Sequence, residues 1–418
     1  MSLAEATPGA GVSMERVAPE EVGLSKERLA RLDTHFERRY LEPGKIAGCL
    51  TLVARDGKIA WLSPQGLSDR KRNAPMTEDT LFRIYSMSKP ITSVALMALY
   101  EEGHFQLDDA AGKIVPALRD LRVYRSGNHP SFLTDPCERP MSVRDLLTHQ
   151  SGLTYGFMEC SNVDAAYREL GIGDRSSSLE TMIQGLAELP LEFSPGTRWN
   201  YSVATDVCGY LVEVLSGQRF DTFLQERIFD PLGMTDTGFQ VPVGQVGRFA
   251  ANYERAPDKS LRLLDDPRTS PYLEPAGLLS GGGGLVSTAT DYARFCQMVL
   301  GGGELDGARI LSPRTLGLMM TNHLPGDADL SRLASGSFSE TTYDGIGFGL
   351  GFAVFLDQAR AEAVGSPGES YWGGAASTIF WVDPSEDLTV VFMTQFMPSG
   401  TFNFRGQLKS IIYGSIVD

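Results

Sequence analysis

The sequence predicts an α+β fold, in which one antiparallel β-sheet is flanked by terminal helices and a mainly helical domain is inserted. Strand-like segments precede residue 98 and return after residue 285, and helix signals dominate between them. Strands at both ends of the chain favour a single sheet with an insertion. We expect a discontinuous α/β domain, residues 1–98 and 285–418, a helical domain, residues 99–284, and an active site in the cleft between the two.

The N-terminal part of the sheet is predicted from local patterns. Ser25 begins an amphipathic helix, because apolar residues then recur every three to four positions. Residues 46–53 and 59–62 are β-prone runs, and Asp56-Gly57 between them is typical of a tight turn. A helix followed by a β-hairpin is therefore expected.

The next segment places a serine at the start of a helix. Leu81–Tyr85 is a short apolar run, and apolar residues at helical spacing follow it as far as Gly103. Pro90 fits the first turn of a helix, where a missing N–H costs nothing. Ser86 therefore lies at or just before the helix N-terminus, with Lys89 one turn further on the same face.

The later elements follow from caps, turns and β-prone runs. Ser142 and Asp145 form a capping-box pattern at the start of one helix, and Pro195-Gly196 marks a turn before a second. Gly281–Gly284 predicts a flexible turn, and Thr288 caps a further helix. The remaining predicted elements are a helix over 203–215, strands over 349–356, 378–382 and 388–393, and a final helix over 402–413.

Composition excludes several classes of partner. A chain of 418 residues with 42% hydrophobic residues is long enough for two domains and a sizeable core. Its formal net charge of −15 argues against nucleic acid or an anionic membrane as partner. No apolar run has the length needed to span a bilayer. Oligomeric state is left open, a homo-oligomer being one alternative.

The cysteines indicate a reducing compartment. The chain has five, an odd number, with no C-x-x-C pair among them, so free thiols packed in the core fit better than a disulfide framework. The first residues have neither a basic start nor an apolar core of the kind found in secretory signals. We therefore expect a cytoplasmic protein. The cysteines are Cys49, Cys137, Cys160, Cys208 and Cys296.

No cofactor is expected. The five histidines form no H-E-x-x-H and no cluster with cysteine at metal-ligand spacing. A phosphate-binding loop and the G-x-S-x-G turn of α/β-hydrolases are both missing. His149 is interpreted as a structural residue at a helix end.

Ser86 and Lys89 could form a nucleophile and its base. A serine hydroxyl is a poor nucleophile until a neighbouring group takes its proton. A neutral lysine can do this if its pKa is lowered from about 10.4, which burial and the positive end of the helix dipole both favour. Backbone N–H groups at the same helix end would stabilise an oxyanion.

The S-x-x-K pattern alone has little weight. Ser68 to Lys71 also matches it, in a polar, turn-rich stretch, and we interpret that match as chance. On this pattern alone an ordinary helix cap beside a solvent-facing lysine is the favoured interpretation of Ser86. Two further segments add candidates, although each by itself could be structural, a tyrosine that anchors a turn and a tight glycine turn. Tyr201 precedes a predicted helix and could relay a proton, and Gly373-Gly374 before a strand would let a substrate approach the backbone.

The order of these segments resembles the serine β-lactamase and penicillin-binding-protein superfamily, and within it the family VIII carboxylesterases with a class C β-lactamase-like fold. The resemblance covers nearly the whole chain from about residue 20. The matching segments are Ser86 to Lys89, Leu146 to Leu153, Tyr201 to Val203, Pro231 to Thr237, Gly282 to Thr288 and Trp372 to Gly374.

The resemblance implies a role for each site residue. Ser86 would be the nucleophile, Lys89 the base and Tyr201 the proton relay, with the backbone N–H groups of Ser86 and Ala375 forming the oxyanion hole. Asp206 is interpreted as a solvated or capping aspartate, with a supporting partner of the site residues as the alternative. The expected substrate-binding residues are Val203, Trp372, Gly373 and Gly374.

Two departures from the β-lactamase pattern favour ester cleavage. The β-lactamases end the tyrosine motif in Asn, where this chain has Val203, and their Lys-Thr-Gly is replaced here by Trp372, Gly373 and Gly374. Without those polar anchors the site suits neutral substrates. We expect a serine carboxylesterase that hydrolyses small short-chain acyl esters through an acyl-serine intermediate, with β-lactam hydrolysis at most weak.

Two alternatives stay open at this stage. An acyltransferase of the same fold would pass the acyl group to an alcohol or amine instead of water. A non-catalytic binding or scaffolding protein with this fold is the other, although such a protein has no need of Ser86, Lys89 and Tyr201 together.

Overall fold

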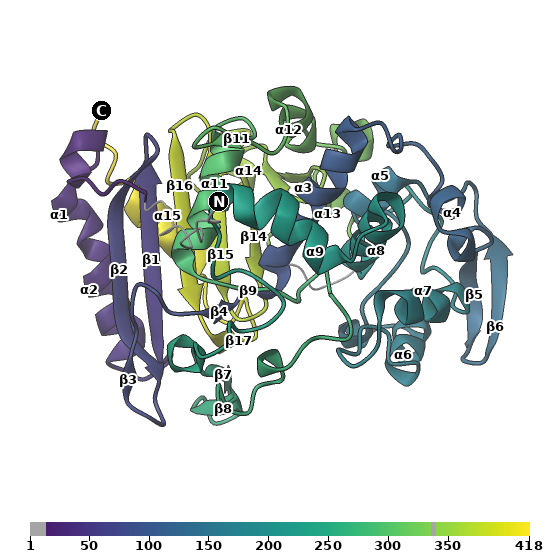
Figure 1. The fold of residues 1–418 in the computed structure, drawn as a ribbon, viewed down its shortest axis with the longest axis horizontal. Coiled ribbons are helices and arrows are strands. Elements are labelled where there is room, and N and C mark those ends of the chain that lie inside the picture. The colour runs from purple at the N-terminus through teal and green to yellow at the C-terminus, as the bar shows by residue number, and fades with distance from the viewer. Residues whose placement is uncertain (1–13, 336–339) are drawn as a thin grey trace, which may run out of the picture.

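A computed structural model of the chain describes residues 14–335 and 340–418. Its centre is an eight-stranded antiparallel sheet (Figure 1). In spatial order the strands are β12 (Ile346–Phe348), β13 (Ala353–Phe355), β14 (Ser370–Gly374), β15 (Thr378–Asp383), β16 (Leu388–Thr394), β1 (Gly48–Arg55), β2 (Lys58–Asp69) and β3 (Ala74–Pro75). The first 13 residues of the predicted α/β domain lie outside the described residues.

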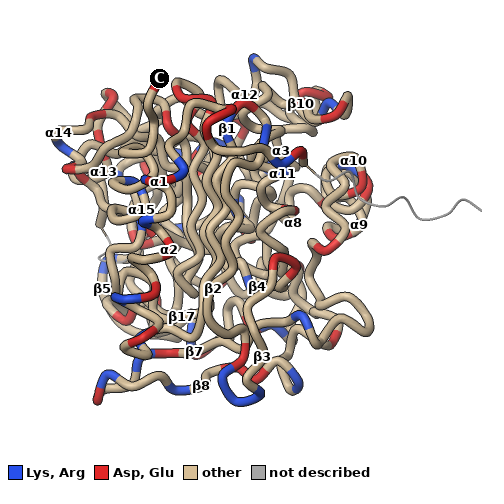
Figure 2. The backbone as a smooth tube through the Cα atoms, turned by 90° about the vertical axis from the view of Figure 1, so that its left-hand side faces the viewer, with Lys and Arg blue, Asp and Glu red and all other residues tan. Residues whose placement is uncertain are grey.

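The two ends of the chain meet in the middle of this sheet. β1 pairs antiparallel with β16 and, on its other side, with β2, so the predicted N-terminal hairpin and the C-terminal strands share one sheet. Strands β1 and β13–β16 are buried apart from the last residue of β1, whereas β2 and β3 at one edge of the sheet are partly exposed and contain more polar residues. Charged residues gather at the ends of β1 and β2 and around the rim of the molecule (Figure 2).

Helices cover both faces of the sheet. The helices are α1 (Lys26–Leu29), α2 (Arg31–Phe36), α3 (Ser88–Glu101), α4 (Ala111–Ile114), α5 (Val143–Leu147), α6 (Asn162–Glu169), α7 (Leu179–Ala187), α8 (Ala204–Ser216), α9 (Phe220–Leu224), α10 (Asp230–Leu232), α11 (Ala289–Leu300), α12 (Pro313–Met319), α13 (Leu330–Leu333), α14 (Gln358–Ala361) and α15 (Phe404–Tyr413). Phe36 of α2 stacks on Phe392 of β16 with ring centroids 5.0 Å apart, and Phe404 of α15 packs on the same ring. The prediction of an antiparallel sheet flanked by terminal helices is confirmed.

The predicted helix caps form as the sequence indicates. The Ser25 side chain accepts from the N–H of Arg28, and the Ser142 side chain accepts from the N–H of Asp145. Thr288 caps α11 in the same way. Each cap supplies an acceptor to a backbone N–H that lacks a partner inside the helix.

Residues 99–284 contain β-strands as well as helices. Short sheets there and nearby were not predicted, because most of their strands are either partly exposed and interrupted by polar residues or only two residues long. The hairpin of β5 and β6 lies at the far end of the molecule from β1 (Figure 1). The small sheets pair β5 (Arg122–Asn128) with β6 (Ser131–Pro136), β7 (Asn252–Arg255) with β8 (Leu261–Asp265) and β17 (Phe396–Met397), β4 (Phe82–Arg83) with β9 (Val286–Ser287), and β10 (Glu304–Leu305) with β11 (Ala308–Arg309).

One predicted strand is wrong. Residues 349–356 were expected to form a single strand, but the chain turns after β12 and returns as β13. Gly351 in the turn has a φ of 94°, which L side chains rarely adopt, and its position leaves no room for a Cβ beside Ser93. Within the predicted range only Ala353–Phe355 is therefore a strand, and β12 lies just before that range.

Helix α3 passes through the middle of the molecule. Every residue from Ser88 to Leu99 is buried, including the polar ones. A helix buried on all sides positions its first turn rigidly, because packing at protein density leaves its side chains little freedom. Ser86 and Lys89 lie at this end of α3.

The described residues contain no helix long and apolar enough to cross a membrane. All five cysteines are free; three of them are buried in the core, and Cys160 is exposed.

Candidate active site

Ser86 and Lys89 lie together at the start of α3. Ser86 is in a short 3-10 turn, Tyr85–Met87, and Lys89 Nζ donates a hydrogen bond to Ser86 Oγ over 3.2 Å. Tyr85 has a φ of 42°, which is strained for a bulky residue and marks a sharp turn from β4 into the helix. Ser86 is 9% exposed and Lys89 only 1%, so the hydroxyl can be reached while the amine is shielded.

The Lys89 amine lies in an aromatic enclosure. Its Nζ is 4.5 Å from the ring centroid of Tyr201 and 5.2 Å from that of Tyr155, and it donates to the carbonyl of Gly282 at 2.7 Å. Burial lowers the pKa of Lys89 to about 7, although the negative charges of Asp206 and Glu340 oppose this. A substantial fraction of this lysine is therefore neutral near pH 7 and able to accept a proton.

Tyr201 joins the same cluster. Its hydroxyl is hydrogen-bonded to Ser86 and accepts from Trp372 Nε1 at 3.3 Å. Burial raises the pKa of Tyr201 well above its usual value, so this phenol keeps its proton at neutral pH. The hydroxyl can pass that proton on while it receives another.

The end of β14 approaches the turn that carries Ser86. A Cβ on Gly374 would lie 2.4 Å from the carbonyl oxygen of Ile84, so only glycine allows the two backbones to come this close. Thr378 Oγ1 donates to the same carbonyl at 3.4 Å. Ala375 follows directly on Gly374 and is thereby brought to the neighbourhood of Ser86.

Comparison with known proteins agrees with this geometry. The amino-acid sequence matches the family model described as beta-lactamase over residues 34–409, which is most of the chain. The chain belongs to the beta-lactamase family. The predicted superfamily and the prediction of a serine hydrolase with this fold are confirmed.

Three similar proteins illustrate the range of this beta-lactamase family. An uncharacterized protein of Mycobacterium tuberculosis is 36% identical over 364 residues, 86% of this chain and 88% of its own length. Esterase EstB of Burkholderia gladioli is 32% identical over 385 residues, 87% of this chain and 90% of its own. The solved structure of EstCE1, a hydrolase with promiscuous acyltransferase activity, superposes with a TM-score of 0.78 at 27% identity, covering 93% of this chain and 99% of its own.

Of the residues expected to bind substrate in this beta-lactamase-family site, two lie in the protein interior and two line a pocket. Trp372 and Val203 are buried, and the indole N–H of Trp372 is engaged by Tyr201. Gly373 and Gly374 line a pocket of about 350 Å³ together with Glu340, and Ser86, Lys89 and Tyr201 are not among its lining residues. The Glu340 side chain has one buried carboxylate oxygen, Oε1, without a hydrogen-bond partner among the described residues.

His149 and Asp206 are both buried beside the cluster. His149 Nδ1 lies 3.2 Å from the hydroxyl of Ser202, and burial with the nearby Lys89 charge holds its pKa well below the usual value, so the imidazole is neutral. Asp206 was expected to be solvated or capping, but it is 3% exposed and accepts from the N–H of Gly282.

The second S-x-x-K match has no catalytic surroundings. Lys71 is 64% exposed and forms an ion pair with Asp266, while the Ser68 hydroxyl donates to backbone carbonyls. No apolar helix follows it, as the sequence indicated.

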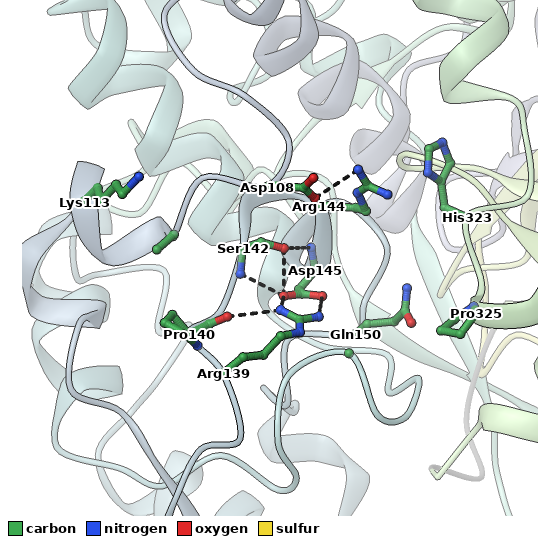
Figure 3. Close-up of a pocket in the computed structure, with 12 residues that line it drawn as sticks. Asp108, Lys113, Arg139, Pro140, Ser142, Arg144, Asp145, Gln150, His323 and Pro325 are labelled. Carbon is green, nitrogen blue, oxygen red and sulfur yellow. Dashed lines mark hydrogen bonds and ion pairs between the residues drawn. The ribbon is translucent and has the colours of Figure 1, made fainter.

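A larger pocket, of about 560 Å³, is not lined by Ser86, Lys89 or Tyr201. Its arginines are already paired (Figure 3): Arg139 binds both carboxylate oxygens of Asp145 at 2.6 and 2.7 Å. Arg144 pairs with Asp108 at 3.0 Å (Figure 3). These positive charges are neutralised within the protein, and the Ser142 hydroxyl in the same pocket is engaged with Asp145 in the cap of α5.

Three residues near Lys89 were not predicted from the sequence. Gly282 supplies a backbone carbonyl, Tyr155 a ring face and Glu340 a carboxylate. Gly282 lies in a segment that matched the family pattern, and Tyr155 follows the matched segment Leu146 to Leu153 by two residues. Proximity to a matched segment could therefore have indicated that each lies near the site. Nothing in the local sequence marks Glu340. Within the described residues no group of three or more His, Cys, Asp or Glu side chains could hold a metal ion.

Proposed function

We propose that this protein is a serine carboxylesterase that hydrolyses short-chain acyl esters through an acyl-serine intermediate on Ser86. The observation that carries the proposal is the contact between the Lys89 amine and the Ser86 hydroxyl at 3.2 Å, inside an enclosure that keeps part of the lysine neutral. Esterase EstB, at 32% identity, supports an ester as the substrate.

In the acylation step Ser86 Oγ attacks the ester carbonyl carbon. Lys89 takes the hydroxyl proton, with Tyr201 as relay, and a tetrahedral oxyanion forms. The backbone N–H groups of Ser86 and Ala375 donate to this oxyanion, and the positive end of α3 adds to its stabilisation. The carbonyl reforms, the C–O bond to the alcohol breaks, and the alcohol leaves with a proton from Tyr201 or Lys89.

In the deacylation step water takes the place of the alcohol. Tyr201 or Lys89 removes a proton from the water, which attacks the acyl-Ser86 carbonyl. Collapse of the second tetrahedral intermediate releases the carboxylic acid and returns the proton to Ser86. Both steps use the same donors, so one site serves the whole cycle.

The absence of a cation at position 372 supports neutral substrates. Trp372 stands where a β-lactamase carries a lysine, and its N–H is already engaged by Tyr201. β-Lactam hydrolysis is therefore proposed to be weak at most.

An acyltransferase is the second candidate. EstCE1 is described as a hydrolase with promiscuous acyltransferase activity, and its chain aligns with nearly all of this one. The two functions share the acyl-Ser86 intermediate and differ in the acceptor. Product analysis with an added primary alcohol separates them, because only transfer yields a new ester. A purely non-catalytic role is disfavoured by the assembled Ser86, Lys89 and Tyr201.

Two further expectations belong to this proposal. The division into an α/β domain, residues 1–98 and 285–418, and a helical domain, residues 99–284, is supported by a nucleophile carried on α3 and a tyrosine carried just before α8. A reducing, cytoplasmic location is supported by five free cysteines.

A panel of p-nitrophenyl esters from acetate to palmitate, assayed beside nitrocefin, tests the proposal. We expect turnover of the short esters, and a fall in kcat of several orders of magnitude for Ser86→Ala, because removing a nucleophile leaves only binding and the oxyanion hole.

The matched control is Ser93→Ala, a buried serine on the same helix whose hydroxyl has no hydrogen-bond partner among the described residues. It should retain activity. Near-normal ester turnover by folded Ser86→Ala would reject the assignment.

A further inference from the structure

Asp206 is a buried carboxylate on the first turn of α8. Its Oδ1 accepts a hydrogen bond from the N–H of Gly282 at 3.0 Å and from the hydroxyl of Ser280 at 2.5 Å. Its Oδ2 lies so close to the same turn that a Cβ on Gly282 would be 2.5 Å away. The carboxylate is therefore packed against this turn from one side.

The peptide units of this turn connect α8 with α3. Gly282 donates its N–H to Asp206, and its carbonyl accepts from Lys89 Nζ at 2.7 Å. One turn further along α3, Thr92 Oγ1 donates to the carbonyl of Gly281 at 2.8 Å. Hydrogen bonds with α8 and with α3 thus hold the turn on both sides, and together they fix the position of the Gly282 carbonyl.

We propose that Asp206 is a positioning residue, which fixes the turn Gly281–Gly284 so that the Gly282 carbonyl holds Lys89 at Ser86. The inference rests on the proposed function of Ser86 and Lys89. Asp206 acts through the Gly282 peptide, because none of its hydrogen bonds reaches the Ser86 hydroxyl. A carbonyl accepts a hydrogen bond from the lysine in both its neutral and charged states, so it holds the amine in place throughout the reaction.

The charge of Asp206 has a second effect on Lys89. A negative charge nearby favours the protonated lysine, so Asp206 keeps the Lys89 pKa higher than burial alone would. Burial in turn raises the pKa of Asp206, against the opposing effects of Lys89 and its hydrogen-bond donors. The other ionisable groups around this pair are Tyr155 and His149 after α5, Tyr201 before α8, Cys208 on α8 and Glu340 after α13.

Two substitutions separate the positioning effect from the charge. Asp206→Asn keeps the shape and the acceptor oxygen, so we expect kcat at high pH within about tenfold of wild type. The acid limb of the pH profile of kcat/KM should move to lower pH by about one unit in this variant, because the pKa of Lys89 falls when the neighbouring anion is removed. Asp206→Ala removes the acceptor, and we expect kcat to fall roughly 100-fold with KM little changed, the size of a general-base contribution.

The matched control is Asp291→Asn. Asp291 is also a buried carboxylate that accepts from one backbone N–H and one hydroxyl, those of Asp236 and Thr237, at 2.8 and 2.9 Å. A merely structural effect of replacing a buried aspartate would appear in both variants. Only Asp206→Asn should shift the acid limb, whereas Asp291→Asn should keep the wild-type pH profile.

The outcomes are distinct for the two proposals. An acid limb of Asp206→Asn that superposes on wild type overturns the inference, as does a loss of less than twofold in Asp206→Ala. If circular dichroism shows that Asp206→Ala does not fold, the pH profile of Asp206→Asn decides alone. Failure of the proposed function itself would appear in Ser86→Ala, which would then keep its turnover.

Discussion

At the scale of single residues, the site depends on a lysine that is neutral part of the time. The Lys89 amine lies against two tyrosine rings. Burial lowers its pKa by more than the two nearby carboxylates raise it. A lysine at its ordinary pKa would be almost wholly protonated near pH 7 and could not act as a base. Enclosure in apolar surroundings is thus the feature on which the proposed reactivity of Ser86 depends.

The pH dependence of activity follows from this pKa. Lys89 must be neutral to accept the proton, so kcat/KM for a neutral ester should rise with pH and reach half its maximum near pH 7. Below that point it should fall tenfold per pH unit, because a single proton blocks the base. Initial rates with p-nitrophenyl acetate between pH 5 and 9, corrected for the ionisation of nitrophenol, measure this. A profile flat across the whole range would contradict the role of Lys89.

At the scale of elements, the turn Gly281–Gly284 packs closely against its neighbours at Gly282 but not at Gly283. A Cβ on Gly282 would lie 2.5 Å from Asp206 Oδ2 and 3.0 Å from the hydroxyl of Tyr155, whereas a Cβ on Gly283 would meet nothing nearer than 3.7 Å. We expect Gly282→Ala to displace the turn and lower kcat roughly 100-fold, the size of a lost general base.

Gly283→Ala serves as the control within the same turn and should stay within a few-fold of wild type. Steady-state kinetics of both variants, with circular dichroism to verify folding, provide the measurement. Equal activity of the two alanine variants would show that the turn tolerates displacement.

Residue spacing predicted the local part of this site, and only the family resemblance indicated its distant parts, such as Tyr201 and Ala375. Ser86 and Lys89 are three residues apart, and helical spacing places such a pair on one face whatever the rest of the chain does. The Gly282 carbonyl contacts Lys89 from a distant turn, and Asp206 contacts Gly282 from α8. No local pattern in the sequence indicates either contact. The strand expected over 349–356 failed for a similar reason, since the conformation of Gly351 depends on packing against α3.

At the scale of the whole molecule, a buried arginine connects segments far apart in the sequence. Arg83, on β4 just before Ser86, is fully buried and donates to Asp265 at 2.7 Å and to the carbonyl of Ala250 at 2.6 Å. Its guanidinium carbon lies 3.8 Å from the ring centroid of Phe249. The strand that leads into the nucleophile is thereby tied to residues 249–265.

Removing this arginine should therefore destabilise the fold more than removing an exposed one. Arg83→Met leaves the Asp265 carboxylate without its cation and the buried carbonyl of Ala250 without its donor, and we expect the free energy of unfolding to fall by about 3–5 kcal/mol. The control is Arg16→Met: Arg16 makes an ion pair with Glu78, but both side chains are about half exposed, and such pairs contribute about 0–1 kcal/mol. Urea unfolding followed by tryptophan fluorescence compares the two variants. A difference between them of less than about 1 kcal/mol would mean that Arg83 is replaceable, and that apolar packing alone holds β4 in place.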